Sequence, residues 1–153
     1  MAGVVESIHV APRKAELPHA VDRVATVAGQ GLQGDRYFSA QGTFSDNGGE
    51  RDITLIAAEA IEAMERDSGI SIEPGEARRN VVVRGVDVNA LVGRRFRVGA
   101  IECYGHELAH PCRHLERLTK PGVLKGLTGH GGLRAGIVAG GEIAVGDPVE
   151  PLD

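Results

Sequence analysis

Aromatic residues are scarce in this sequence, which has no tryptophan, two tyrosines and three phenylalanines among its 153 residues. Positive charge is also in the minority, because 17 lysines and arginines face 21 aspartates and glutamates and leave a formal net charge of -4 at pH 7. A protein that wraps a nucleic acid needs a positive surface, and single strands are commonly held by stacking on aromatic rings. The composition therefore argues against a nucleic-acid partner.

Long apolar stretches are missing as well. No run approaches the roughly 18 apolar residues that a membrane-spanning helix needs, and no apolar segment of a secretory signal follows Met1. The two cysteines, Cys103 and Cys112, could form one bridge at most, which is a weak basis for a disulfide framework. We therefore expect a cytoplasmic protein with no membrane partner.

The rest of the composition is that of an ordinary globular protein, with 42% hydrophobic and 25% charged residues. A chain of this length fits one domain, which should bury roughly 68–70% of the surface that the unfolded chain exposes. The sequence has no internal repeat, linker or low-complexity tail. We expect residues 1–153 to form a single domain.

Alternating or continuous apolar residues predict short strands separated by glycine and proline. The expected strands cover residues 4–10, 21–27, 53–56, 81–83, 94–101 and 137–145. In the first of them, Val4, Ile8 and Val10 are expected on the buried face. A helix is predicted for 57–67, ending at Gly69. Many short strands, one clear helix and 22 glycines predict a mainly β fold, a closed or nearly closed β-barrel with a few attached helices.

The predicted helix has one apolar face. Its members are Ala57, Ala60, Ile61 and Met64. Glu62 stands four residues before Arg66, a spacing that favours an ion pair along the helix. We expect this helix to be structural and to pack against the sheet.

The segment 29–36 is rich in glycine and ends in Asp35 and Arg36. Glycine permits positive φ and close approach of the backbone to a ligand, and Asp35 could orient a donor such as Arg36. A tight loop closed by an ion pair between Asp35 and Arg36 is an equal alternative. Residues 39–51 follow as a long polar loop that could act as a lid.

Six arginines occupy one short region, although the chain is acidic as a whole. They are Arg78, Arg79, Arg84, Arg94, Arg95 and Arg97. The group indicates either a solvated basic face or a site for a small anion. Arg79 and Asn80 lead directly into the apolar strand 81–83, and such a strand end can fix side chains rigidly.

Cys112 has the more reactive context of the two cysteines. Pro111 favours the start of a helix, and a thiol in the first helical turn is stabilised as a thiolate. Such a thiolate could attack an electrophile, carry a persulfide sulfur or bind a soft metal. Cys103, within an expected strand, is most simply a small buried apolar residue.

Zinc is an alternative for the same region. The possible ligands are His106, His110, Cys112 and His114. Their spacing matches no common zinc motif, and His110 and His114 could equally face solvent.

The loop 129–134 is a second candidate contact. Its consecutive glycines could present N–H groups to an anion, and Arg134 could bind a phosphate through two nitrogens. The loop lacks the lysine and serine of a P-loop. A glycine-rich turn with a surface arginine is the alternative.

Several of these pieces, in this order, resemble the MOSC domain family, whose members are related to the C-terminal part of molybdenum cofactor sulfurases. The matching pieces are Gly34-Asp35-Arg36, Arg79-Asn80 with the following valines, residues 91–99, Pro111-Cys112 with Leu115, and Gly132-Leu133-Arg134 before Gly146-Asp147. The resemblance covers nearly the whole chain. It implies a β-barrel-rich fold and a site for the pyranopterin molybdenum cofactor.

The resemblance also implies roles for individual residues. Cys112 matches the expected molybdenum ligand or sulfur carrier and would be the catalytic residue. The residues expected to hold the cofactor are Arg79, Asn80, Gly132 and Arg134, with a less defined role for Asp35 and Arg36. Pyridoxal phosphate is associated with the family, but no residue of this sequence is assigned to it.

Two functions are compatible with this resemblance. The first is a molybdenum-dependent reductase of N-hydroxylated or related N-oxygenated compounds, supplied with electrons by a separate protein. The second is a carrier that holds a persulfide on Cys112 without turnover of its own and receives sulfur from a separate donor protein. The sequence contains no cysteine desulfurase domain and no cysteine-rich electron-transfer domain, so both functions need a protein partner besides a small-molecule substrate.

Overall fold

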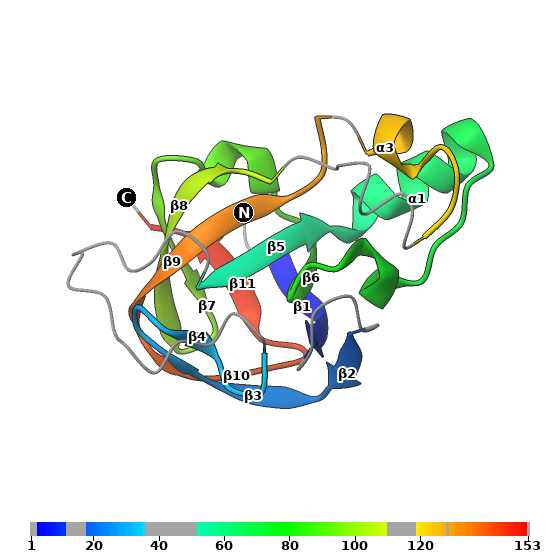
Figure 1. The fold of residues 1–153 in the computed structure, drawn as a ribbon. Coiled ribbons are helices and arrows are strands. Elements are labelled where there is room, and N and C mark those ends of the chain that lie inside the picture. Colours follow the sequence, from blue (N-terminus) through cyan, green and yellow to red (C-terminus); the bar gives the residue numbers. More distant parts are fainter. Residues whose placement is uncertain (1–2, 12–17, 36–51, 110–118, 128, 153) are drawn as a thin grey trace.

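A computed structural model gives the fold (Figure 1) and describes residues 3–11, 18–35, 52–109, 119–127 and 129–152. Arg36, Cys112 and the loop expected to act as a lid lie outside these residues. No helix in the described ranges is both long and apolar enough to cross a membrane.

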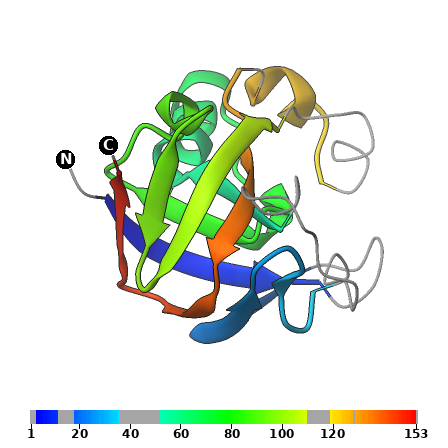
Figure 2. The same cartoon turned by 90° about the vertical axis from the view of Figure 1, so that its left-hand side faces the viewer.

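Seven of the described strands close into a barrel, as the sequence predicts. In spatial order these are β11 (Pro148–Pro151), β7 (Arg95–Val98), β8 (Ile101–Leu108), β9 (Leu133–Ala139), β5 (Ile53–Ala57), β6 (Val81–Arg84) and β1 (Gly3–Val10). The pair Gly3 and Val149 joins β1 back to β11, and these two strands lie side by side in Figure 2. Neighbours in this ring are antiparallel except β5 and β6, which are parallel.

A smaller sheet covers one end of the barrel. It consists of β10 (Gly141–Ala144), β3 (Arg23–Val27) and β4 (Gly31–Leu32), and it lies along the lower edge of the view in Figure 1. The short strand β2 (His19–Val21) extends the barrel sheet beyond β1. The expected strand over 21–27 is therefore two strands, which belong to different sheets.

Helical segments gather beyond the ends of β5 and β6. They are α1 (Ala58–Ser68), α3 (Val123–Gly126) and the 3₁₀ turns η1 (Pro74–Ala77) and η2 (Val88–Leu91). α1 and α3 lie together at the upper right of Figure 1. Gly69 ends α1 as predicted, with a φ of 71° and its N–H donated to the carbonyl of Glu65.

The interior of the barrel is apolar, and Phe96 and Val98 are completely buried while Arg95 and Arg97 are exposed, as their alternation predicts. A second apolar cluster lies between the barrel and α1. It contains Ile56, Ala58, Ile61, Met64, Ile72, Ala77, Val82, Val123 and Leu127. The first three residues of β6 are apolar because Val81 and Val83 face the interior while Val82 faces this second cluster.

The expectation for Val4 is wrong. Val4 is 38% exposed, whereas Val5 and Ile8 are buried in the barrel. The register of β1 against β6 shifts between Val5 and Ser7, and this bulge reverses the alternation of inward and outward side chains.

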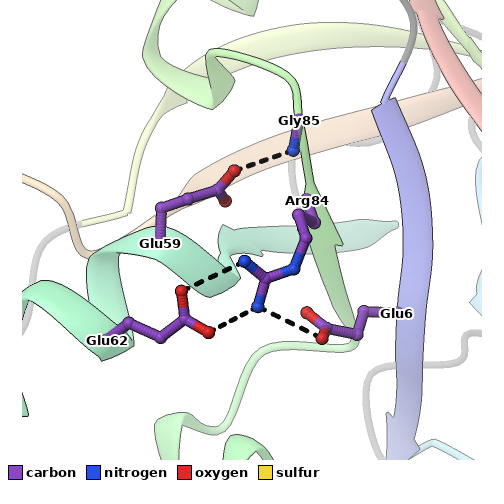
Figure 3. A network of polar contacts seen from close by, with 5 residues as sticks. All are labelled: Glu6, Glu59, Glu62, Arg84 and Gly85. Atoms are coloured by element: carbon purple, nitrogen blue, oxygen red, sulfur yellow. Dashed lines mark hydrogen bonds and ion pairs between the residues drawn. The ribbon is translucent and has the colours of Figure 1, made fainter.

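The expected pairing of Glu62 with Arg66 is also not observed. Both carboxylate oxygens of Glu62 accept hydrogen bonds from Arg84 on β6, and Arg84 also donates to Glu6 on β1 (Figure 3). The hydrogen bond from Arg84 is the main reason that the pKa of Glu62 is lowered. These exposed contacts tie α1 to two barrel strands.

Candidate functional site

Asn80 stands immediately before β6 and joins three strands through its side chain. Its Oδ1 accepts hydrogen bonds from the backbone N and from Oγ1 of Thr54, at 3.1 and 3.2 Å, and its Nδ2 donates to the carbonyl of His9 at 3.2 Å. The residue is only 8% exposed. The predicted cofactor residue is thus part of the barrel's internal hydrogen bonding.

Arg79 reaches across to the loop before β9, where its Nε donates to the carbonyl of Gly131 at 2.7 Å. Gly132 has a φ of 111°, and a Cβ on it would lie 2.2 Å from the carbonyl oxygen of Leu55 and 3.3 Å from Nε of Arg79. The absence of a side chain at Gly132 therefore lets this loop pack against β5 and against Arg79.

The same loop is hydrogen bonded to the end of β8. The carbonyl of Gly132 accepts from the backbone N of Ala109 at 2.8 Å. Ala109 is the last described residue before 110–118, and Cys112 follows it by three positions. The predicted cofactor segment at Gly132 is thus directly bonded to the chain that leads to Cys112.

Arg134 belongs to β9 and not to the preceding loop. It lies opposite Thr54 of β5, and its Nη1 donates to Oε1 of Glu107 on β8 at 3.0 Å. The side chain of Arg134 is 31% exposed and that of Glu107 is 55% exposed. Arg134 is therefore at the surface of the barrel wall, within an ion pair, and whether it binds phosphate stays a prediction.

Asp35 ends the glycine-rich segment, and its Oδ1 accepts a hydrogen bond from the backbone N of Ala11 at 2.9 Å. Ala11 follows His9 by two residues, and the backbones of His9 and Asn80 are also hydrogen bonded. Asp35 thus reaches the surroundings of Asn80 through the end of β1. The predicted ion pair with Arg36 lies outside the described residues.

The glycines at 29, 31 and 34 all have positive φ, as predicted. Two of them surround Asp52, a buried residue that the sequence reasoning missed. Oδ2 of Asp52 accepts from the backbone N of Gly29 and of Ile137, each at 3.0 Å, and a Cβ on Gly31 would lie 2.9 Å from the carbonyl oxygen of Asp52. The close approach that these glycines permit is made to the protein's own chain.

The arginine-rich region is divided between different surroundings. Arg84 is bonded to Glu62 and Glu6, and Arg95 forms an ion pair with Glu102 on the neighbouring strand. For Arg84 and Arg95, the structure favours the interpretation as a solvated basic face over a site for a small anion. Arg79 alone of the group makes the contact with Gly131.

Cys103 is fully buried within the barrel, as expected. Burial raises the pKa of its thiol well above the usual range, and the nearby carboxylates of Asp52 and Glu102 raise it further. Cys103 is therefore unsuited to act as a nucleophile or a metal ligand.

The zinc alternative has only one ligand candidate in the described part of the chain. His106 packs edge-on against Tyr104, with ring centroids 5.2 Å apart, and its buried Nε2 has no hydrogen-bond partner among the described residues. Among the described residues, no group of three or more histidine, cysteine, aspartate or glutamate side chains could hold a metal ion. His110, Cys112 and His114 lie outside them, so the zinc hypothesis stays untested.

Similar proteins agree with this architecture. The YuaD protein of Bacillus subtilis has a TM-score of 0.83 and 20% identity, with 99% of this chain and 96% of that chain covered. YiiM of Escherichia coli has a TM-score of 0.74 and 17% identity, covering 100% and 70%, and YiiM of Geobacillus stearothermophilus has 0.71 and 18%, covering 99% and 75%. Identities this low show a shared fold alone.

No curated protein matches the chain. A family model described as the MOSC domain matches residues 8–150, which is nearly the whole chain and includes every strand of the barrel in whole or in part. The chain belongs to the MOSC domain family.

Proposed function

We propose that this chain binds the molybdenum cofactor and acts as a cytoplasmic oxidoreductase that reduces N-hydroxylated or related N-oxygenated compounds. The observation that carries the proposal is the arrangement of Arg79, Asn80 and Gly132 beside Ala109. Three separate parts of the sequence meet there, residues 79–80, 131–132 and 109, and the chain continues from Ala109 to Cys112. Three peptide units span at most about 11 Å, so Cys112 can reach this neighbourhood.

The chemistry of these residues fits the cofactor in part. The guanidinium groups of Arg79 and Arg134 suit an anionic phosphate, and a cysteine thiolate suits a soft metal such as molybdenum. Arg79 is held at its Nε by Gly131, which orients the guanidinium group. Asn80 contributes by fixing the strand ends, because its Oδ1 already accepts two hydrogen bonds from Thr54.

When bound, the cofactor supplies a redox-active metal for removing oxygen from the substrate. The overall reaction converts an N–OH group to N–H and water, and it consumes two electrons and two protons. In this proposal a separate electron-donor protein supplies the electrons, and the fully buried thiol of Cys103 takes no part in their delivery.

Metal analysis tests this proposal. The full chain would be expressed in a host that makes the cofactor, and molybdenum would be measured per folded protein. We expect Cys112→Ala to abolish loading, whereas the matched variant Cys103→Ala removes the buried thiol and leaves loading largely intact. A folded wild-type protein without molybdenum would refute the proposal. If the protein contains molybdenum, a reduction assay with an N-hydroxylated base tests its turnover.

A second candidate function is the persulfide carrier, for which the burial of Cys103 leaves Cys112 as the cysteine that would hold the sulfur. In this function the thiolate of Cys112 attacks the persulfide of a desulfurase cysteine, takes its outer sulfur and leaves the donor cysteine as a thiolate. Mass spectrometry after incubation with a desulfurase and its cysteine substrate would find one added sulfur on the peptide with Cys112. Its absence, with Cys103 also unmodified, rejects the carrier function.

A further inference from the structure

A cavity of about 660 Å³ lies between α1, residues 85–89 and residues 125–132. Its volume is within the range of about 300–1,000 Å³ that is typical of small-molecule sites. Apart from Gly132, none of the predicted cofactor residues within the described ranges lines it. The cavity is therefore a distinct feature that adjoins the predicted cofactor residues at one point.

The cavity exists because small residues line it from several sides. Ala60 and Ala63 line it along α1, while Ala58, Ile61 and Met64 supply the buried face of the helix. The sequence places Ala57 and Ala60 on the core face, but both line the cavity. Gly126 lines another side, where a Cβ would meet Met64 at 2.6 Å. The apolar surface includes Met64, Val86 and Val88.

Among the described lining residues, carboxylates outnumber cationic groups. Glu59, Asp67 and Asp87 are opposed by the ammonium group of Lys125, and His130 is the other titratable residue present. Glu59 is held in place because its Oε2 accepts a hydrogen bond from the backbone N of Gly85 at 2.8 Å.

Figure 3 shows that Glu59 and Glu62, both on α1, have different hydrogen-bond partners. Arg84 lies on the same side of α1 but donates to Glu62 and Glu6, while Glu59 contacts only the backbone of Gly85 among the residues drawn. A fixed carboxylate without a cationic partner in the described chain attracts a positively charged group to the cavity.

The start of α1 acts in the opposite sense, since Ala57 provides no side-chain cap and the first N–H groups of a helix favour an anion. Its partial positive charge amounts to about half a unit, which is smaller than the full charges of Glu59 and Asp87 beside it. The balance of the lining favours a cation.

We propose that this cavity binds a small organic cation with an apolar body. The apolar body would lie against Ala60, Ala63 and Met64, and the cationic group would face Glu59 and Asp87. The inference rests on the cavity alone and holds whether or not the chain carries the molybdenum cofactor.

Binding of three probes of the same size tests the charge preference. Benzylammonium, neutral benzyl alcohol and anionic benzoate would be titrated into the full chain and followed by amide chemical shifts. We expect benzylammonium to bind at least about tenfold more tightly than benzyl alcohol, a difference of about 1.4 kcal/mol. Equal or tighter binding of benzoate, or no binding of benzylammonium at millimolar concentration, overturns the proposal.

Two variants of α1 identify the residues. Glu59→Gln retains a hydrogen-bond acceptor for Gly85 and should weaken benzylammonium binding by about threefold, as expected for an exposed charge. Glu65→Gln removes a carboxylate from the same helix at a position outside the cavity, and it should leave the affinity for benzylammonium unchanged. Ala60→Leu fills the cavity and should weaken the binding of both benzylammonium and benzyl alcohol. Equal effects of Glu59→Gln and Glu65→Gln on benzylammonium binding contradict the proposed position. Unchanged binding of benzylammonium to the Ala60→Leu protein contradicts it as well.

Discussion

Replacement of Asn80 by alanine would separate a structural role of this residue from a role in holding a cofactor. The substitution removes three hydrogen bonds, two from Thr54 to Oδ1 and one from Nδ2 to the carbonyl of His9. Each contributes about 1 kcal/mol, so we expect the free energy of unfolding to fall by about 3 kcal/mol. For a domain of this size, that corresponds to a decrease in melting temperature of about 6–12 °C.

The assay is thermal and urea unfolding of the protein without cofactor, because a residue that only holds the cofactor would leave this form unchanged. Asn89→Ala is the matched control. Asn89 makes one side-chain hydrogen bond, from Nδ2 to the carbonyl of Gly129, in an exposed position, and its loss should cost about 1 kcal/mol or less.

A second variant, Thr54→Val, tests the contact itself. Oγ1 of Thr54 donates to Oδ1 of Asn80 and accepts from the backbone N of Asn80. Because the two side chains share a hydrogen bond, the double variant Asn80→Ala/Thr54→Val should lose at least about 0.5 kcal/mol less than the sum of the single losses. Additive losses, or an Asn80→Ala protein that melts within about 2 °C of wild type, would refute the structural role.

Three further predictions concern buried groups. Gly132→Ala should lower the urea midpoint at least about twice as much as Gly34→Ala, since both glycines have positive φ but only Gly132 would bring a Cβ against the backbone of Leu55; equal losses contradict this. Burial lowers the pKa of His9 below its usual 6.5, so the unfolded state binds more protons and stability should fall as pH decreases below about 6.5; His9→Gln should flatten this dependence, and an unchanged slope counts against it. Iodoacetamide at pH 8 should leave Cys103 unmodified in the native protein and label it in urea, as peptide mass spectrometry would show, because burial raises the pKa of its thiol; native labelling would contradict its burial.

Much of the barrel could be predicted from the sequence because alternation in a strand depends on adjacent residues. Phe96 and Val98 are buried between exposed arginines, and the run Val81 to Val83 is apolar on both faces because the barrel interior and α1 cover it. This alternation does not predict which of Val4 and Val5 is buried. A bulge forms where one strand mismatches its partner, and the partner strand β6 begins more than seventy residues later in the chain.

The sequence names the residues of the candidate site but does not predict their contacts, and their role in binding a cofactor stays a prediction. Asn80 bonds to Thr54, 26 positions away, and to His9, 71 positions away. Arg79 bonds to Gly131, 52 positions away. These partners are fixed by the order of strands around the barrel, which local patterns do not determine. The cavity beside α1 escaped prediction for the same reason, because segments far apart in the sequence line it.

The hydrogen bonds at this end of the barrel restrict which residues can recognise a ligand. Oδ1 of Asn80 and Oδ2 of Asp52 already accept two hydrogen bonds each from the protein, and the close approach at Gly132 is occupied by Leu55 and Arg79. In the proposed function, recognition of a ligand therefore falls to side chains at the surface of this framework. In that function, Arg134 would exchange its exposed contact with Glu107 for a phosphate at small cost, since an exposed ion pair contributes about 0–1 kcal/mol. In the proposed function, the framework residues therefore position the ligand, and the exposed charges select which ligand binds.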